Sequence, residues 1–317
     1  MLLRAPAKIN LSLRILSKRA DGYHEISSLM RAIRLFDDVG ISFSGRGAGG
    51  AGERGRPRFA LNVPGDAEGV PSGSDNLAYR AAELAAEAWG RNECPGELPG
   101  GAGRNIDIAL TKRIPAAAGL AGGSADAAAV LLGLAKGLNT GAALAEVAAL
   151  GASLGADVPF CVYSCAAANP SLGYEGAGAA LAEGIGERIS PITAPESGWV
   201  VLVKPRAEVR SGEIYAMYDA RQNPAPLAHG NDLEAPCAEA RPAVAEVLSG
   251  MKKICAEEAE EAGGCPRGAK CQLSGSGPTV FAYFPETDPN AQTLAACVYR
   301  RAKTAFPDMF THLTETL

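Results

Sequence analysis

The feature that most constrains this chain is a glycine loop that passes directly into an alanine-rich helical segment. Residues 112–132 read KRIPAAAGLAGGSADAAAVLL, with Gly119, Gly122 and Gly123 ahead of Ser124. Glycine lets the backbone come close to a ligand, and the first turn of a helix has several N–H groups without intrahelical partners. Together with the positive end of the helix dipole, these groups form an anion site that suits phosphate. No Gly-Lys-Ser or Gly-Lys-Thr ends the loop, so it is not a Walker A motif.

Composition and charge describe a globular chain of two-domain size. The 317 residues are 47% hydrophobic and 21% charged, as in ordinary globular proteins, and a chain of this length accommodates two cores. A formal net charge of −5 argues against a general nucleic-acid binder, which needs a basic face. The first ten residues hold no apolar stretch ahead of a cleavage site, and residues 114–138 carry charges that a membrane span lacks. We therefore expect a cytoplasmic protein that binds neither nucleic acid nor membrane.

The eight cysteines do not indicate a disulfide framework. Their spacings form no paired C-x-x-C sets, and a chain of this length does not need cross-links to stabilise its core. We expect reduced thiols that pack as small hydrophobic side chains. A metal site that uses Cys265 and Cys271 stays open as an alternative.

Hydrophobic periodicity predicts strands and helices without regular β-α-β repetition, which is typical of an α+β fold. Strands are expected at 8–16, 26–35, 106–110, 199–203 and 280–284, and helices at 76–89, from the glycine loop to 138, and at 143–154, 211–218, 241–262 and 290–305. Ser74 or Asp75 is the expected cap of the first helix. Segments 44–58 and 95–103 are expected to be glycine-rich loops, and 165–190 an irregular transition between two domains.

Four short motifs stand apart from this core pattern. They are Pro6-Ala-Lys-Ile-Asn10 followed by Asp21-Gly-Tyr-His24, the glycine loop, Gly155-Ala-Asp-Val-Pro-Phe160, and Leu273-Ser-Gly-Ser-Gly-Pro-Thr279. In this order, and with Asn231-Asp-Leu-Glu234 between the last two, they make the chain resemble the GHMP kinases over nearly its whole length. The resemblance implies a two-domain α+β fold, with domains 1–164 and 165–317 and the active site in the cleft between them.

The resemblance implies that ATP binds along the glycine loop, with magnesium offsetting the triphosphate charge. The implied nucleotide contacts are Pro115, Ala116, Ala117, Ala118, Gly119, Leu120, Ala121, Gly122, Gly123, Ser124 and Ala125, with Asn76 and Leu77 beside the adenine. The loop has Ala121 where the family usually has a third glycine, and Ala125 offers no hydroxyl. We therefore expect backbone N–H groups to bind the phosphates, and the sequence assigns no metal ligands.

Two charged residues in the motifs are implied as the catalytic pair. A strand lysine such as Lys8 is by default a solvated cation, and Asp157 between Gly155 and Pro159 is by default a turn or cap residue. The resemblance instead implies that Lys8 lies near the transferred phosphoryl group, where its charge stabilises the reaction. It makes Asp157 the base that accepts the hydroxyl proton. Asp126 lies in a first helical turn, where the dipole alone favours an acid, and we expect it to be structural.

A second group of residues is implied as the substrate site. Tyr23 and His24 are by default turn residues, but the resemblance implies that Tyr23 stacks on a cytosine and that His24 hydrogen-bonds beside it. Stacking on a base is worth about 1–3 kcal/mol and tolerates any base, so discrimination must come from hydrogen bonds. Tyr215 is implied as a second aromatic across the base, the alternative being a place in a helix core. Asn10 is implied to orient the diphosphate or the sugar alcohol.

Together these roles imply an ATP-dependent kinase of the non-mevalonate isoprenoid precursor pathway. Its acceptor would be the 2-hydroxyl of 4-diphosphocytidyl-2-C-methyl-D-erythritol, and it would be a monomer or a weak homodimer. A GHMP kinase that acts on homoserine or mevalonate is one alternative, against which Tyr23 and His24 argue. A catalytically inactive nucleotide sensor on the same fold is another, against which the presence of Lys8 and Asp157 argues.

Overall fold

The chain forms two compact units that interleave along the sequence. The computed structural model describes residues 1–45, 58–64, 69–89, 104–193, 196–221, 230–264 and 266–317. Unit 1 comprises Met1–Ala7, Phe36–Ala116 and Ala121–Ala177, and unit 2 comprises Lys8–Leu35, Ala117–Leu120 and Gly178–Leu317. This division differs from the predicted domains 1–164 and 165–317, because the long strands β1 (Leu2–Lys18) and β2 (His24–Gly45) contribute residues to both units.

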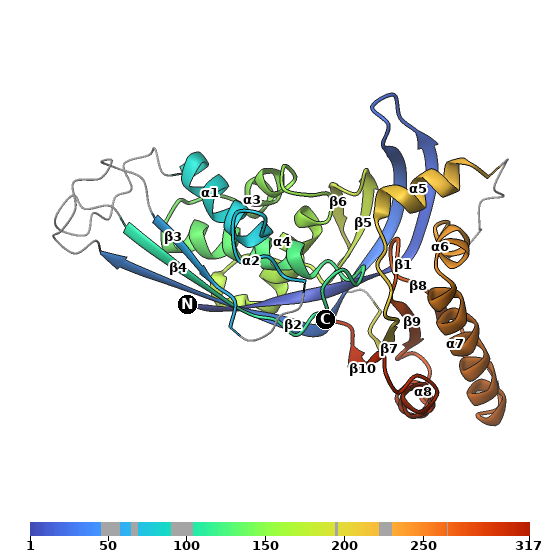
Figure 1. Cartoon of the computed structure of the whole chain (residues 1–317). Helices are drawn as coiled ribbons and strands as arrows, with labels where there is room; N and C mark the ends of the chain where they lie inside the picture. The colour runs from blue at the N-terminus through green and yellow to red at the C-terminus, as the bar shows by residue number, and fades with distance from the viewer. Residues whose placement is uncertain (46–57, 65–68, 90–103, 194–195, 222–229, 265) are drawn as a thin grey trace. The chain divides into compact units, whose positions relative to one another are not determined.

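In unit 1 the carboxyl-terminal half of β2 forms a sheet with β4 (Arg104–Thr111) and β3 (Arg58–Asn62). Strand β2 pairs antiparallel with β4, and β3 joins β4 in parallel (Figure 1). Every second residue of the middle of β4, namely Ile106, Ile108 and Leu110, is buried. This period of two is what a strand with one face on a core requires, and it confirms the strand predicted at 106–110.

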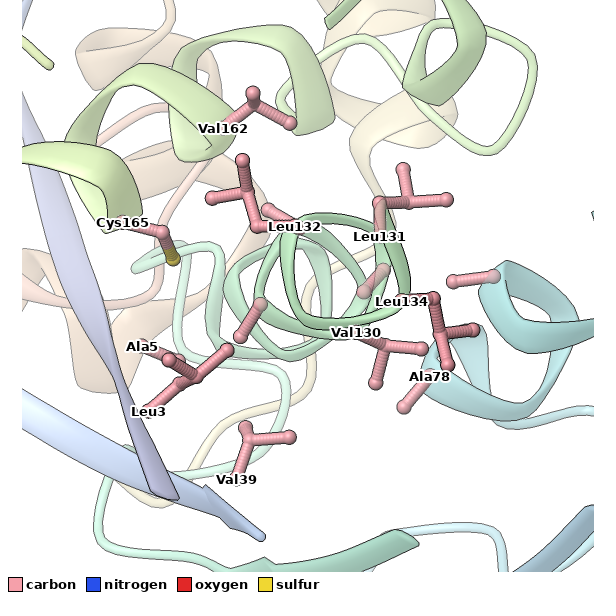
Figure 2. Close-up of a cluster of buried hydrophobic side chains, with 14 of the residues drawn as sticks. Leu3, Ala5, Val39, Ala78, Val130, Leu131, Leu132, Leu134, Val162 and Cys165 are labelled. Carbon is pink, nitrogen blue, oxygen red and sulfur yellow. The ribbon is translucent and has the colours of Figure 1, made fainter. Parts of the chain in front are cut away.

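The core of unit 1 is built around α2 (Gly122–Gly137), the helix that follows the glycine loop. This helix is buried without a break from Ala125 to Ala135. Helices α1 (Leu77–Trp89), α3 (Leu144–Gly151) and α4 (Val158–Ala168) pack against it. Figure 2 shows Leu131, Leu132 and Leu134 of α2 among side chains from β1, β2, α1 and α4. Small alanine side chains let these elements approach closely, so a chain with only 6% aromatic residues still fills its core.

In the described part of unit 2, the strands form two antiparallel groups. The amino-terminal half of β2 pairs with β5 (Ala179–Gly184), which pairs with β6 (Arg188–Pro191). A four-stranded sheet has the order β10-β7-β9-β8, from β7 (Gly198–Lys204), β8 (Lys270–Leu273), β9 (Val280–Pro285) and β10 (Phe310–Glu315). Helices α7 (Pro242–Glu261) and α8 (Ala291–Ala305) pack on this sheet. The shorter helices α5 (Ser211–Asp219) and α6 (Glu234–Ala240) precede them in the chain.

The α+β class predicted from the sequence is confirmed, and the predicted helices at 76–89, 211–218, 241–262 and 290–305 correspond to α1, α5, α7 and α8. The helix predicted at 143–154 is shorter and ends at Gly151. The irregular segment predicted at 165–190 is wrong, because it holds the end of α4, a short 3-10 helix (Pro170–Leu172) and β5. Helix α4 is buried on most sides, so its sequence lacks an apolar stripe that would reveal it.

Three further expectations concern loops, thiols and membrane spans. Residues 46–57 and 95–103 of the predicted loops lie outside the described residues, as do Cys94 and Cys265. None of the six cysteines that the structure describes takes part in a disulfide. Among the described helices, none combines the length and the apolar character that crossing a membrane takes.

Candidate functional site

The middle of the glycine loop, Ala117–Leu120, belongs to unit 2 and is held there by backbone hydrogen bonds. The N–H of Lys8 on β1 donates to the carbonyl of Leu120 (3.1 Å), and the N–H of Thr279 donates to the carbonyl of Ala118 (3.4 Å). Lys8 and Thr279 each lie in a motif singled out in the sequence. Unit 2 therefore brings together the Lys-Ile-Asn part of the first motif, the middle of the glycine loop and the Ser-Gly-Ser-Gly loop.

Gly119 is the residue of this loop where a side chain fits least. Its φ is +71°, and a Cβ built on it would lie 2.5 Å from the carbonyl oxygen of Gly277 and 2.8 Å from that of Ser274. The Ser274 hydroxyl also donates to the Gly119 carbonyl, at 3.1 Å. The two glycine-rich loops thus meet backbone to backbone, which requires the absence of a Cβ at this point.

The last part of the glycine loop forms the first turn of α2 in unit 1. Gly122 and Ser124 are half-buried and Gly123 is exposed, whereas Ala125 is buried in the core. The side chain of Leu77, implied to lie beside the adenine, is next to Gly123, since a Cβ there would lie 3.5 Å from Leu77 Cδ1. An anion can therefore approach the first-turn N–H groups, while the methyl of Ala125 points into the core.

Two alanines of the loop adopt backbone angles that favour glycine. Ala121, the N-cap of α2, has a φ of +57°, and Ala117 has a φ of +48°. A residue with a Cβ in this left-handed region costs about 1–2 kcal/mol relative to ordinary helical angles. The methyl of Ala121 therefore strains the loop but removes none of its N–H donors.

Lys8 and Asn10 are buried neighbours on β1 within unit 2, with 4% and 1% of their surfaces exposed. The Lys8 ammonium donates to Asn10 Oδ1 at 2.8 Å, and Asn10 Nδ2 donates to the hydroxyl of Ser28 on β2 at 2.7 Å. A Cβ on Gly275 would lie 3.3 Å from Asn10 Oδ1 and 3.6 Å from Lys8 Nζ. The lysine is thus held in one orientation next to the Ser-Gly-Ser-Gly loop, unlike a solvated surface cation.

Asn231, from the Asn-Asp-Leu-Glu motif, fastens that loop. It is buried, and its Nδ2 donates to the carbonyls of Leu273 (2.9 Å) and Gly275 (2.6 Å). Its Oδ1 accepts from the N–H of Leu233 at 2.9 Å. All three bonds go to backbone groups, so this side chain positions the loop beside Lys8.

His24 lies at the start of β2 and is 7% exposed, whereas the neighbouring Tyr23 is 60% exposed. The ring of Tyr215 on α5 stacks on the imidazole, with ring centroids 4.9 Å apart and an interplanar angle of 22°. The structure therefore brings together His24 and Tyr215, two of the three residues implied to bind a base. The exposed ring of Tyr23 remains accessible to a ligand.

Asp219 is a residue of this region that the sequence reasoning missed. Its Oδ1 lies 2.7 Å from His24 Nε2, and its Oδ2 accepts from Lys18 Nζ at 2.6 Å. The hydrogen bond from Lys18, followed by that from His24, lowers the pKa of the Asp219 carboxyl below its usual value. The sequence could have indicated Asp219 through its spacing, because it follows Tyr215 by four residues and therefore lies on the same face of α5.

Asp157 occupies the N-cap position of α4 in unit 1, with φ −79° and ψ −17°. Its carbonyl accepts from the N–H of Cys161 at 3.0 Å, while its half-buried carboxylate makes no capping bond to the helix. The side chain therefore does not cap the helix, although Asp157 does lie in the turn that leads into α4, as the default turn reading expects. Asp157 belongs to unit 1 and Lys8 to unit 2.

Asn76 caps α1, which corrects the expected cap at Ser74 or Asp75. Its Oδ1 accepts from the N–H of Ala78 at 2.9 Å, and its Nδ2 donates to the carbonyl of Pro71 at 2.7 Å. Asn76 is 6% exposed. Both ends of its side-chain amide are thus hydrogen-bonded to backbone groups. Any contribution of Asn76 to an adenine site would therefore come from the shape that it gives to this loop.

The acidic residues of the described segments do not gather into a metal centre. Across these segments no group of three or more His, Cys, Asp or Glu side chains is arranged to hold a metal ion. A magnesium ion that arrives with a nucleotide needs few protein ligands, because it keeps several waters and binds phosphate oxygens.

Comparisons with known proteins agree with this arrangement. Residues 76–165 match the family model of the GHMP kinases N terminal domain. The 4-diphosphocytidyl-2-C-methyl-D-erythritol kinase of Alkaliphilus metalliredigens (strain QYMF) is 32% identical over 99% of this chain and 96% of its own. The enzyme of that name from Geobacillus thermodenitrificans (strain NG80-2) is 38% identical over 88% of this chain and 86% of its own.

Solved structures show the same similarity. A crystal structure of 4-(cytidine 5'-diphospho)-2C-methyl-D-erythritol kinase matches 100% of this chain and 99% of its own, with a TM-score of 0.66 and 30% identity. A homoserine kinase from Cytophaga hutchinsonii ATCC 33406 matches with a TM-score of 0.61 at 16% identity, and so shares the fold alone. The chain therefore belongs to the GHMP kinases, in the family of the 4-diphosphocytidyl-2-C-methyl-D-erythritol kinases.

Proposed function

We propose that this chain transfers the γ-phosphoryl group of ATP to the 2-hydroxyl of 4-diphosphocytidyl-2-C-methyl-D-erythritol, a step of the non-mevalonate isoprenoid precursor pathway. The observation that carries the proposal is the 32–38% identity with kinases of that name over most of both chains. Homoserine kinase shares the fold at only 16% identity. Fold alone does not select a substrate, so the sequence identity decides between these branches.

The proposed reaction depends on Asp157 and Lys8. Asp157 accepts the proton of the 2-hydroxyl as that oxygen attacks the γ-phosphorus, and Lys8 offsets the negative charge that develops. The place of Asp157 at the amino-terminal end of α4 and the buried, oriented ammonium of Lys8 support these roles. Asn10, which holds Lys8 through its Oδ1, orients the diphosphate or the sugar alcohol beside it.

The proposed nucleotide site is the glycine loop. Backbone N–H groups at Gly122, Gly123 and Ser124 bind the phosphates, and the helix dipole of α2 adds to their attraction. Leu77 lies beside Gly123 and would border the adenine. A magnesium ion that enters with ATP would neutralise part of the triphosphate charge.

The proposed cytidine site is formed by Tyr23, His24 and Tyr215. An ionised Asp219 can only accept, so Nε2 of His24 carries the hydrogen that faces it, and Nδ1 is left to accept from the ligand. The exocyclic amine of cytosine is a hydrogen-bond donor, so it can donate to Nδ1 of His24. The exposed ring of Tyr23 adds stacking.

Release of ADP, measured in parallel with three acceptors, tests the proposal. We expect turnover with 4-diphosphocytidyl-2-C-methyl-D-erythritol and none with homoserine or mevalonate. Turnover with homoserine or mevalonate but not with the cytidine compound would contradict the assignment. Nucleotide binding without turnover on any of the three would identify a sensor instead.

A further inference from the structure

Three charged side chains form a buried cluster at the entrance to the glycine loop, entirely within unit 1. Asp37 on β2 is fully buried, Asp126 in the first turn of α2 is 2% exposed, and the side chain of Lys112, which follows β4, is 9% exposed. The Lys112 ammonium donates to Asp37 Oδ2 and to Asp126 Oδ2, the latter at 2.5 Å. The lysine therefore bridges β2 and α2.

The cluster also fixes the backbone that enters the loop. Asp37 Oδ1 accepts from the N–H of Arg113 (2.5 Å) and from the N–H of Ile114 (2.9 Å). A Cβ on Gly122 would lie 3.5 Å from Lys112 Nζ, so the ammonium lies against the first turn of α2. Both ends of the glycine loop in unit 1 are thus attached to the same three side chains.

Stability alone explains this cluster poorly. Burying two carboxylates and one ammonium carries a desolvation penalty that often exceeds the attraction between them, and apolar residues of similar size are frequently as stable. Asp126 Oδ1 moreover has no hydrogen-bond partner in the described part of the chain, although it is buried. An unpaired buried carboxylate oxygen adds to the cost, which points to a role beyond holding the core.

We propose that Asp37, Lys112 and Asp126 are positioning residues that hold the glycine loop ready for nucleotide phosphates, and that a single proton shared within this cluster modulates nucleotide affinity. The inference rests on the proposed function, in which ATP binds at this loop. With Asp126 protonated the three side chains sum to zero charge, and with it ionised they sum to −1. The second state opposes the approach of a phosphate anion.

The groups that face Asp126 determine where this proton exchanges. The pKa of Asp126 is raised to about 7, because burial and the nearby Asp37 raise it more than Lys112 lowers it. Burial lowers the pKa of Lys112, but Asp126 and Asp37 outweigh it and raise the value above normal, so the lysine stays charged. From α4, Cys165 has its pKa raised well above normal by burial and by Asp126, so it stays neutral. Asp126 is therefore the group of this cluster that exchanges a proton near neutral pH.

The test is nucleotide affinity as a function of pH, measured by calorimetry with magnesium and ADP between pH 6 and 8. As the pH rises from 6 to 8, the affinity of the unmodified protein for ADP should fall. In Asp126→Asn, whose side chain has the same shape but cannot ionise, the fall should be smaller by a factor of about three to ten. Lys112→Met should weaken ADP binding about tenfold or more and raise the KM for ATP, with a smaller change in kcat. Asp38→Asn is the matched control, since Asp38 pairs with Arg113 on the surface next to the cluster.

The outcomes separate this inference from the proposed function. Equal pH profiles for the unmodified protein and Asp126→Asn would overturn the proton exchange, and normal ADP affinity in Lys112→Met would overturn the positioning. If Lys112→Met does not fold, the test uses Asp126→Asn and Lys112→Arg instead. Lys112→Arg keeps the positive charge and should bind ADP with the affinity of the unmodified protein. Absence of nucleotide binding by the unmodified protein would overturn the proposed function as well. Binding that no cluster variant alters would overturn only this inference.

Discussion

The Asp219 carboxylate lies 2.7 Å from Nε2 of His24, and the ring of Tyr215 stacks on the same imidazole. Two contacts of different kinds, one polar and one aromatic, thus fix the plane and the tautomer of a nearly buried histidine. Both come from α5, some 190 residues further along the chain. This helix therefore determines which nitrogen of His24 is offered to a ligand.

We expect Asp219→Ala to raise the KM for the cytidine substrate about tenfold with little change in kcat. Without Asp219 the imidazole of His24 is no longer oriented, which weakens substrate binding but does not affect the phosphoryl-transfer step. Lys18→Ala is the control, since Lys18 binds the other oxygen of Asp219 from an exposed position and should change KM less than twofold. Steady-state kinetics with saturating ATP checks both. An unchanged KM in Asp219→Ala would remove the carboxylate from substrate binding.

Asp157→Asn should lower kcat by about a hundredfold or more while ATP affinity changes little, because the amide cannot accept the hydroxyl proton. The two quantities are measured separately, turnover by ADP release and affinity by calorimetry. Turnover at the normal rate would exclude Asp157 as the base. A parallel loss of nucleotide affinity would indicate a structural role at the start of α4.

Gly119→Ala should destabilise the protein by about 3 kcal/mol or more, because its Cβ would collide with the backbone of Gly277 and Ser274 at a positive φ. Gly212→Ala is the matched control. Gly212 lies in α5 with open space around its Cβ position, so the change should stabilise by about 0.5–1 kcal/mol. Chemical denaturation gives both free energies of unfolding. Equal effects would contradict the close packing of the two loops.

Ala121→Gly should raise the free energy of unfolding by up to about 1 kcal/mol, because it relieves the left-handed backbone at the N-cap of α2. The same exchange at Ala296, inside α8, should lower it by about 1 kcal/mol, since glycine is a poor residue for a helix interior. The opposite signs are the test. Destabilisation at both positions would show that the alanine at 121 is not strained.

The helices and strands were predictable from the sequence wherever apolar residues recur with the period of a helix or a strand. The periodic apolar residues of α1 and the alternation in β4 gave the right elements, since each has one face on a core. Helix α4 has no such face, because Val158, Phe160, Cys161 and Val162 are all buried, and it was missed.

The site was predictable only where it lies within one motif. Lys8 and Asn10 are two residues apart on one strand, and their contact follows from that spacing. Asp219 reaches His24 across 195 residues, and Lys112 reaches Asp37 across 75. Such pairs arise from tertiary packing, and local spacing can at most place Asp219 on the same helix face as Tyr215.

The chain passes from one unit to the other after Ala7, Leu35, Ala116, Leu120 and Ala177, and this has a consequence for synthesis on the ribosome. Ile33 of β2 bridges to Thr316, and the N–H of Leu317 donates to the carbonyl of Ala32. Unit 2 therefore cannot be completed until Thr316 and Leu317 have been synthesised, and until then the edges of its early strands stay unpaired. No truncation at a single point would release an intact half, so shortened gene products should be targets for chaperones and proteases rather than working fragments.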